Sequence, residues 1–371
     1  MLEKIYDKLE IDYISKSILL PFLAIISLGA IAFFSASLGI LNRNEVKFYG
    51  MIESQMYAYL IGIILMCISF IFSYVYIYRL SPYIYILTIV SSFLVFLPGV
   101  GIAHGGSTRW INVFGFSLQP AELIKISTVL ITAWYLKKYD GKIREIKYAL
   151  IGYFIIMGPV AIAMFLQKDL GTLIVIGSIV TVIFFTSKSK ITHILSFMGI
   201  GVLVALLYVS MNSYVRNRIY DYAGIGGNSK GISYQADQAL IAIGNGGIFG
   251  RGLGKSIQKF HYLPEPAGDS VFAVFSEEFG FFGSVIVVLL FGFLCVNLML
   301  KSIYIKDIFI KNVIIGSAVL LFFQSLLNIG SMLKIIPLSG DTLPFFSQGG
   351  TSLIANFIIM GLLLQLTKKY I

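Results

Sequence analysis

Long runs of apolar residues alternate with short polar stretches along the chain. The apolar runs cover approximately residues 17–40, 56–78, 83–102, 120–136, 148–166, 170–187, 191–211, 279–299, 312–333 and 351–367. Because roughly 20 apolar residues cross the ~30 Å hydrocarbon core of a membrane, this pattern predicts about ten transmembrane helices. We therefore expect an all-α polytopic membrane protein forming a single domain over residues 1–371. An even number of crossings puts both termini on the same side.

Two segments fall outside this pattern. Residues 1–16 have mixed charge and apolar positions at helical spacing, which predicts an interfacial helix before the first crossing. Residues 212–270 are predicted to be a large loop between the seventh and eighth helices. Within this loop, residues 221–233 are rich in Gly, Asn and Ser and are expected to be mobile. Residues 234–244 have the composition of a short helix that ends at glycine.

The composition agrees with the membrane interpretation. Hydrophobic residues make up 57% of the chain and charged residues only 12%, and the mean hydropathy is +0.87. A water-soluble globular protein needs far more polar surface, so that class is excluded. Cys67 and Cys295 both lie in apolar runs and suggest no disulfide framework.

The distribution of Lys and Arg predicts the orientation. If the termini are cytoplasmic, most basic residues of the short loops lie inside, and the short outer loops contain only Arg43, Lys47, Arg109, Lys168 and Lys334. This arrangement satisfies the positive-inside rule. The net charge of +10 is then explained by topology and by contact with anionic lipids, and no nucleic-acid partner is indicated.

Acidic residues cluster where the 212–270 loop meets the eighth apolar run. They are Glu265, Asp269, Glu277 and Glu278. Carboxylates placed where a chain re-enters lipid are costly unless they are paired or used, which makes them candidates for function. Asp269, directly at the junction, is the leading candidate for a catalytic residue.

A second group of charges opens the fourth run. Pro120 is a helix-start signal, and Glu122 and Lys125 then share one helix face. The pair is either an interfacial ion pair worth a few tenths of a kcal/mol or part of a site facing a cavity. Upstream, Arg109 beside Trp110 suggests either phosphate binding or anchoring in the lipid headgroups.

Further candidates lie on the same predicted outer side. Asp169 precedes the sixth run and is either a helix cap or a site residue, and Arg216 and Arg218 follow the seventh run. The stretch 336–352, which contains Ser347, is rich in Pro, Gly and hydroxyl groups and is expected to pack over a cavity.

Metal and nucleotide templates do not fit the residues. The three histidines are isolated, with no metal-ligand spacing, and the glycine-rich stretch 250–256 lacks the P-loop pattern. Carboxylates with Arg and Lys beside a membrane suit a lipid-linked diphosphate. Cations would neutralise the leaving group, and one carboxylate would accept a proton from an attacking hydroxyl.

Together these motifs resemble the SEDS family (FtsW, RodA and SpoVE) of bacterial cell-wall synthesis. The likeness runs from about residue 98 to 356. It is carried by Arg109-Trp110, Phe116–Lys125, Asp169-Leu170-Gly171-Thr172, Tyr234-Gln235, the glycines of 246–254, Gln258-Lys259-Phe260, Tyr262–Glu265, Asp269, Glu277-Glu278, Asn328-Ile329-Gly330 and Leu343–Ser352. The pattern around 98–101 and 116–120 favours the division-type, FtsW-like branch.

The resemblance implies a peptidoglycan glycosyltransferase that polymerises lipid II at the outer face of the bacterial cytoplasmic membrane. It implies that Asp269 is essential and that Glu122, Lys125 and Asp169 line the same cavity. It also implies a class B penicillin-binding protein and other divisome or elongasome proteins as partners, and a divalent cation, Mg²⁺ or Mn²⁺, as cofactor.

Two other functions use the same residues differently. A lipid II flippase would need polar groups at midplane depth or through both leaflets, whereas a transferase needs them on the product side only. The acids here fall near predicted outer helix ends, which favours the enzyme. A scaffold that only recruits a penicillin-binding protein would leave these outer carboxylates without a purpose.

Overall fold

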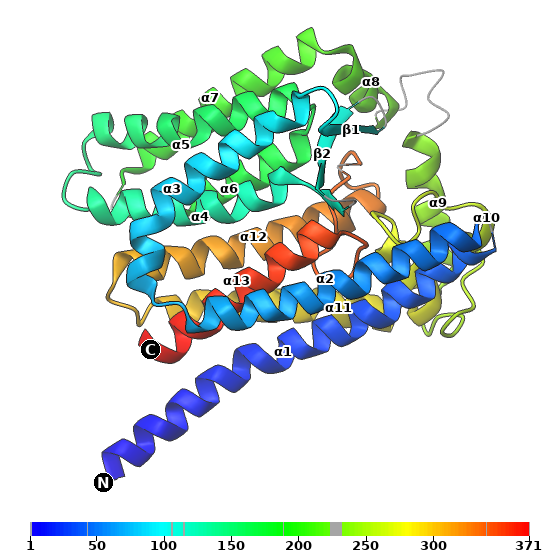
Figure 1. Cartoon of the computed structure of the whole chain (residues 1–371), viewed down its shortest axis with the longest axis horizontal. Helices are drawn as coiled ribbons and strands as arrows, with labels where there is room; N and C mark the ends of the chain where they lie inside the picture. Colours follow the sequence, from blue (N-terminus) through cyan, green and yellow to red (C-terminus); the bar gives the residue numbers. More distant parts are fainter. Residues whose placement is uncertain are drawn as a thin grey trace.

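The computed structural model describes residues 2–42, 44–104, 107–113, 116–187, 189–222, 232–338 and 340–370. Long helices dominate the architecture (Figure 1). They are α1 (Leu2–Leu41), α2 (Glu45–Ile71), α3 (Tyr74–Phe93), α4 (Pro120–Lys138), α5 (Ile146–Leu166), α6 (Leu170–Thr186), α7 (Ile191–Met211), α11 (Val271–Ser302), α12 (Ile308–Met332) and α13 (Gly350–Tyr370). These ten helices follow the ten predicted apolar runs in order along the chain, which confirms the helical polytopic fold.

Not all of these helices have the length and composition of a simple membrane span. Among the described residues, eight helices are long and apolar enough to cross a membrane. The apolar helix α6 has only 17 residues, and α4 carries both acidic and basic side chains. Helix α1 is continuous from Leu2, so the predicted segment 1–16 is its first part. The count of ten crossings and the interfacial position of residues 1–16 stay predictions.

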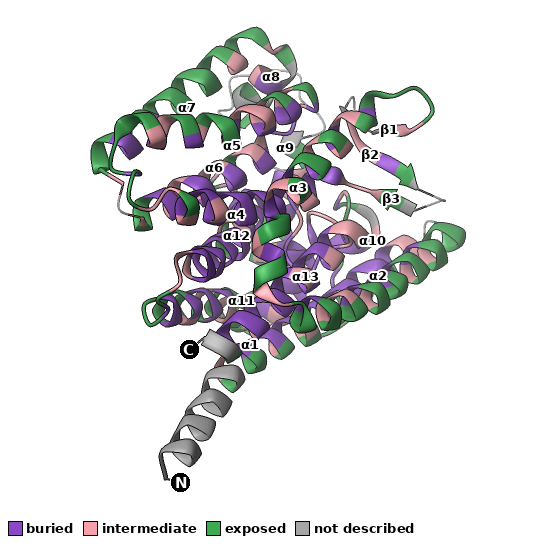
Figure 2. Cartoon of the chain, turned by 60° about the vertical axis from the view of Figure 1, so that its left-hand side comes forward, coloured by how far each residue is buried: buried purple, intermediate pink, exposed green. Residues whose placement is uncertain are grey.

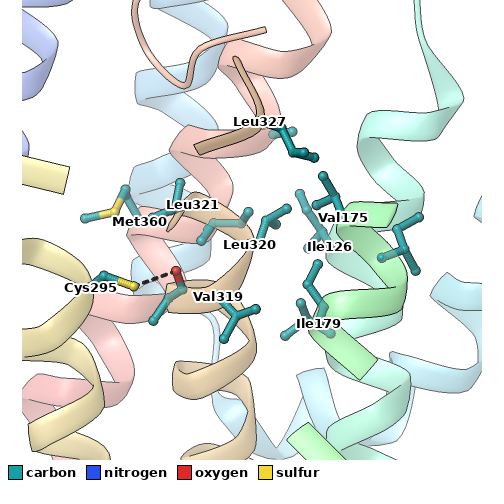
Figure 3. Close-up of a cluster of buried hydrophobic side chains, with 14 of the residues drawn as sticks. Ile126, Val175, Ile179, Cys295, Val319, Leu320, Leu321, Leu327 and Met360 are labelled. Carbon is teal, nitrogen blue, oxygen red and sulfur yellow. Dashed lines mark hydrogen bonds between the residues drawn. The ribbon is translucent and has the colours of Figure 1, made fainter. Parts of the chain in front are cut away.

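Helix α12 lies at the centre of the bundle. It packs against α4 and α6 on one side and against α11 on the other (Figure 1). In the most apolar 18-residue stretch of α12, 83% of the residues are buried, compared with 11% for the same stretch of α7. Figure 2 shows α7 exposed along most of its length. In the core, Leu320 and Leu327 lie near Ile126 of α4 and Val175 and Ile179 of α6 (Figure 3). The apolar exposed faces of the outer helices suit a lipid surrounding.

The predicted boundary between the second and third helices was wrong. The chain turns at Phe72 and Ser73, which have extended backbone angles, whereas the apolar pattern placed the turn near Arg79. Arg79 instead lies inside α3, which is followed by the short 3-10 helix η1 (Leu94–Phe96). Because this turn is short and lies among apolar and aromatic residues, the hydropathy of the sequence does not mark its position.

The all-α prediction also missed a small antiparallel sheet after η1. Strands β1 (Gly101–His104), β2 (Ser107–Val113) and β3 (Phe116–Leu118) are arranged in that order. The long loop contains α8 (Ser213–Tyr222), α9 (Ile232–Asn245) and α10 (Gln258–His261). Helix α9 confirms the short helix predicted at 234–244. Most of the stretch predicted to be mobile, 221–233, lies outside the described residues.

Helix α11 is broken one third of the way along. Gly280 has φ 67° and ψ −163°, angles that are essentially restricted to glycine. The break leaves backbone groups unpaired within the helix, and the loop before α10 bonds to them. The amides of Arg251 and Gly252 donate to the carbonyls of Glu277 and Glu278 at 3.0 Å, and the Phe281 amide donates to Gly247 at 2.8 Å. Helix α11 starts at Val271, before the predicted start of the apolar run at 279.

The break predicts a severe effect of Gly280→Ala. A Cβ at this position would lie 2.3 Å from the Gly250 nitrogen, and the backbone angles alone would cost on the order of 1–3 kcal/mol. We expect a lower thermal unfolding temperature in detergent and a lower yield of folded protein. The matched control is Gly292→Ala in the same helix, where a Cβ would meet nothing within 4 Å. Equal melting temperatures for the two variants would contradict this account of the break.

Candidate active site

Glu122 and Lys125 form a buried ion pair at the start of α4. Pro120 occupies the first turn of the helix, so the two side chains lie one turn apart on the same face. The Lys125 Nζ donates to Glu122 Oε1 at 2.9 Å, and the side chains are only 1% and 6% exposed. The alternative of a solvent-exposed interfacial pair does not fit this burial.

A second carboxylate approaches Lys125 from the loop between α12 and α13. Asp341 Oδ1 lies 4.0 Å from Lys125 Nζ, and Asp341 is buried. Lys125 therefore stands between two acids from different parts of the chain. A lone ammonium or carboxylate in this position would be strongly unfavourable, so the three groups depend on one another.

Asn328 of α12 links this cluster to Asp269. Its side-chain amide donates to the backbone carbonyl of Asp269 at 2.9 Å and to that of Asp341 at 2.7 Å. The Asp269 carboxylate also lies over the Asp341 loop, since a Cβ on Gly340 would be 3.6 Å from Asp269 Oδ2. The structure thus places Asp269 beside the Lys125 cluster, although the two are far apart in sequence.

Asp169 is the helix cap that one of the two sequence alternatives predicted. Its carboxylate caps α6 by accepting from the Thr172 amide at 3.4 Å and the Thr172 hydroxyl at 3.1 Å. It also lies 3.7 Å from the Arg109 guanidinium. Asp169 is therefore a helix cap paired with Arg109, and its role as a site residue stays a prediction.

Arg109, on β2, is held by the turn between α5 and α6. Its Nε donates to the Gln167 carbonyl at 3.3 Å and its Nη2 to the Lys168 carbonyl at 2.5 Å. The side chain is 11% exposed. With these partners and Asp169, the guanidinium fastens the sheet to the bundle, and the contacts give no support to the predicted phosphate binding.

Two acids near Asp269 in sequence do not join the cluster. Glu277 accepts from the Ser256 hydroxyl at 2.5 Å and from the backbone amides of Ile257 and Gln258, where the loop enters α10, at 3.2 Å each. It therefore holds that loop against α11. Glu265 is exposed, and its positive φ of 45° places it in a tight turn before Asp269.

Ser347, Arg216 and Arg218 are not shown to face the cluster either. The Ser347 hydroxyl accepts from the Leu343 amide at 2.8 Å and so shapes its own loop. Arg216 Nη1 donates to the Ser210 carbonyl at 3.1 Å, at the end of α7. The side chain of Arg218 lies outside the described part of the chain. Their predicted roles in substrate binding stay predictions.

Sequence reasoning missed Asp341 and Asn328 as site residues. The signal for Asp341 was present, since it is an acid in a short loop between two apolar runs. Asn328 is notable for another reason: its Oδ1, like Oε1 of Gln324 one turn earlier, is buried without a hydrogen-bond partner among the described residues. Both amide oxygens are enclosed by the protein, since Gln324 and Asn328 are each only 1% exposed.

The resemblance also implies a divalent cation, which would need several carboxylate or histidine ligands close together. The described residues contain no group of three or more His, Cys, Asp or Glu side chains that could hold a metal ion. Lys125 also occupies the space beside Asp341. The described residues alone do not form a metal site, so the cation stays a prediction.

Comparison with known proteins identifies the family. A model of cell cycle proteins that covers FtsW, RodA and SpoVE matches residues 15–370. The chain belongs to this family. It is 30% identical to a probable peptidoglycan glycosyltransferase FtsW from Geobacter sulfurreducens, over 97% of this chain and 96% of that protein. It is 34% identical to stage V sporulation protein E from Bacillus subtilis, over 74% of this chain and 75% of that protein.

Solved structures agree with the family assignment. A chain in a peptidoglycan synthase complex, described for its coordination of polymerization and crosslinking, superposes with a TM-score of 0.77 and 26% identity, covering 95% of this chain and 97% of that one. The rod shape determining protein RodA from Thermus thermophilus gives a TM-score of 0.68 and 27% identity, covering 96% and 97%.

The buried cluster predicts that Lys125→Met is strongly destabilising. The substitution leaves Glu122 and Asp341 buried without their cation, and breaking such a pair costs about 3–5 kcal/mol. The double variant Glu122→Gln/Lys125→Met removes one of the stranded charges, so we expect it to recover part of the lost stability while remaining inactive. Thermal unfolding in detergent measures both effects.

The matched control is Lys137→Met, in a pair with Asp307 whose side chains are 31% and 26% exposed. More exposed pairs are worth about 0–1 kcal/mol, so this variant should unfold close to wild type. A Lys125→Met protein as stable as Lys137→Met would argue against a buried, mutually dependent cluster, and normal activity of the double variant would favour the interfacial alternative.

Proposed function

We propose that this protein is a peptidoglycan glycosyltransferase that polymerises lipid II at the outer face of the bacterial cytoplasmic membrane, with Asp269 as general base. The observation that carries the proposal is the link made by Asn328. One amide group holds the backbones of Asp269 and Asp341, and Asp341 approaches the buried Lys125. Asp269 is thereby positioned beside a charge cluster by a central helix.

The proposed chemistry is a displacement at a sugar carbon. The C4 hydroxyl oxygen of one sugar chain attacks the anomeric carbon of a second, lipid-linked chain. The bond from that carbon to the diphosphate oxygen breaks, undecaprenyl diphosphate leaves, and Asp269 takes the hydroxyl proton. Lys125 would supply positive charge near the leaving group.

The position of the charges supports a transferase over a flippase. Lys125 lies one turn into α4 and Asp169 caps α6, while Asp269 lies just before α11. All are near helix ends on one side of the bundle, whereas a flippase requires polar groups at midplane depth. The names of the relatives, glycosyltransferase and peptidoglycan synthase complex, support the same choice.

We also propose a class B penicillin-binding protein as partner, because a structural relative comes from a complex that combines polymerization with crosslinking. Other divisome or elongasome proteins would join this pair. The location in the cytoplasmic membrane with both termini inside rests on the distribution of Lys and Arg.

Asp269→Asn tests the proposed base. Asn keeps the shape of Asp but cannot accept the proton, so we expect polymerisation of labelled lipid II to fall by about 10²–10⁴-fold. Folding should be retained, because Asn has the same size and shape as Asp and the Asn328 bond to the backbone carbonyl of residue 269 is unaffected. Polymerisation is measured in liposomes with the purified protein, with and without a penicillin-binding partner.

Two amide variants serve as controls for this experiment. Glu265→Gln changes an exposed acid four residues away and should stay close to wild type. Glu277→Gln should lower stability more than intrinsic rate, because Glu277 holds a loop. Asp269→Asn activity within about threefold of wild type, a margin far below the usual general-base effect, would exclude Asp269 as the base and reopen the flippase alternative.

The orientation is tested by labelling in a background without Cys67 and Cys295. An impermeant thiol reagent on intact cells should label Asn245→Cys at the exposed end of α9 and spare Gly141→Cys between α4 and α5. Asn245 is exposed, and a Cβ on Gly141 meets nothing within 4 Å, so both changes should be tolerated. The reverse labelling pattern would overturn the orientation and the site's location at the outer face.

A further inference from the structure

An exposed apolar surface lies where the loop before α10 crosses the break in α11. We call residues 247–253 the apolar loop. Within it, Phe249 is 81% exposed, Leu253 60% and Ile248 59%. Large side chains of this kind, grouped on a surface, mark a contact with a membrane or another apolar partner.

The apolar loop continues the lipid-facing side of α11. The ring of Phe249 lies 5.6 Å from that of Phe282, and Phe281 and Phe282 are themselves exposed. Beyond them the same helix exposes Ile286, Leu289, Phe293, Val296 and Leu300, and α11 is long and apolar enough to cross a membrane. From Gly280 to Ser302 the helix rises roughly 33 Å, close to the ~30 Å hydrocarbon thickness. A bilayer crossed by this part of α11 would have the apolar loop at the edge of its hydrocarbon core.

The backbone of the apolar loop is suited to this position. Irregular backbone is tolerated in an apolar medium only where its polar groups are bonded inside the protein. Here the amides of Arg251 and Gly252 donate to α11, and the carbonyls of Gly247 and Ile248 accept from it. The Gly250 amide donates to Gly246 at 2.8 Å.

Basic residues accompany the apolar side chains. Arg251 and Lys255 are both exposed. Arg251 donates to the Asn245 carbonyl at 3.4 Å and lies 3.6 Å from the Glu277 carboxylate, whereas a long basic side chain such as Lys255 can extend toward lipid phosphates. We propose that the apolar loop inserts Ile248, Phe249 and Leu253 into the headgroup and acyl boundary of the leaflet nearest Asp269. The occupant of this surface is the lipid bilayer itself.

The apolar loop is connected to the candidate base through α11. The apolar loop is bonded to the broken segment of α11, whose first part follows Asp269 directly. The loop that contacts the bilayer and the candidate base are therefore both joined to α11. A lipid-linked substrate would reach the base from this side. The inference concerns only which medium covers the loop, so it stands or falls separately from the proposed base.

The test uses single cysteines in protein lacking Cys67 and Cys295, purified and reconstituted in phosphatidylglycerol and phosphatidylethanolamine vesicles. A fluorophore on Phe249→Cys is quenched either by nitroxide-labelled lipids or by aqueous iodide. The lipid reference is Leu289→Cys on the exposed face of α11, and the aqueous reference is Arg144→Cys in the polar turn between α4 and α5. Ile248→Cys repeats the measurement at a second position.

We expect Phe249→Cys and Ile248→Cys to be quenched by lipid nitroxides at least half as strongly as Leu289→Cys, and to be shielded from iodide relative to Arg144→Cys. Strong iodide quenching without lipid quenching would show that the loop lies in water and would overturn the proposal. Protection from both quenchers would show that protein covers the loop, and would overturn it equally.

Discussion

Lipid offers no hydrogen bonds, so the polar groups that this chain carries into the membrane depend on partners inside the protein. The break of α11 at Gly280 shows the consequence most directly. Carbonyls at Glu277 and Glu278 are bonded by amides of a loop more than twenty residues earlier. That loop is in turn held by the Glu277 carboxylate. Helix and loop therefore form one unit, and Asp269 lies at its edge.

The same constraint sorts the acidic residues into two groups. Glu278 is bound by Lys259 of α10 at 2.6 Å and by Ser35 of α1 at 2.7 Å, so it joins α1, α10 and α11. Glu277 holds the loop before α10. Buried carboxylates with such complete partners are structural, because their removal would strand a charge or several amides. Asp269 precedes both glutamates in the chain, and Asn328 of α12 donates to its backbone carbonyl.

The charge cluster and Asn328 connect Asp269 to the centre of the bundle. Lys125 belongs to α4, Asp341 to the loop before α13 and Asn328 to α12, and α12 is the most buried of the candidate spans. A side chain placed by a packed core can be held to the precision that catalysis needs. The outer helices, by contrast, present apolar faces that suit lipid.

The sequence by itself determined that this is a helical membrane protein with its acids near helix ends, because bilayer thickness sets the length of apolar runs and charges are excluded from them. It also indicated Asp269, Glu122, Lys125 and Asp169 from local position. Only the tertiary structure decided what depends on residues distant in the chain. Contacts between separate segments decide four features: the turn at Ser73, the sheet before α4, the hold of Glu277 on the loop before α10, and the place of Asp341 beside Lys125. The periodicity of one segment does not indicate which other segments it will contact.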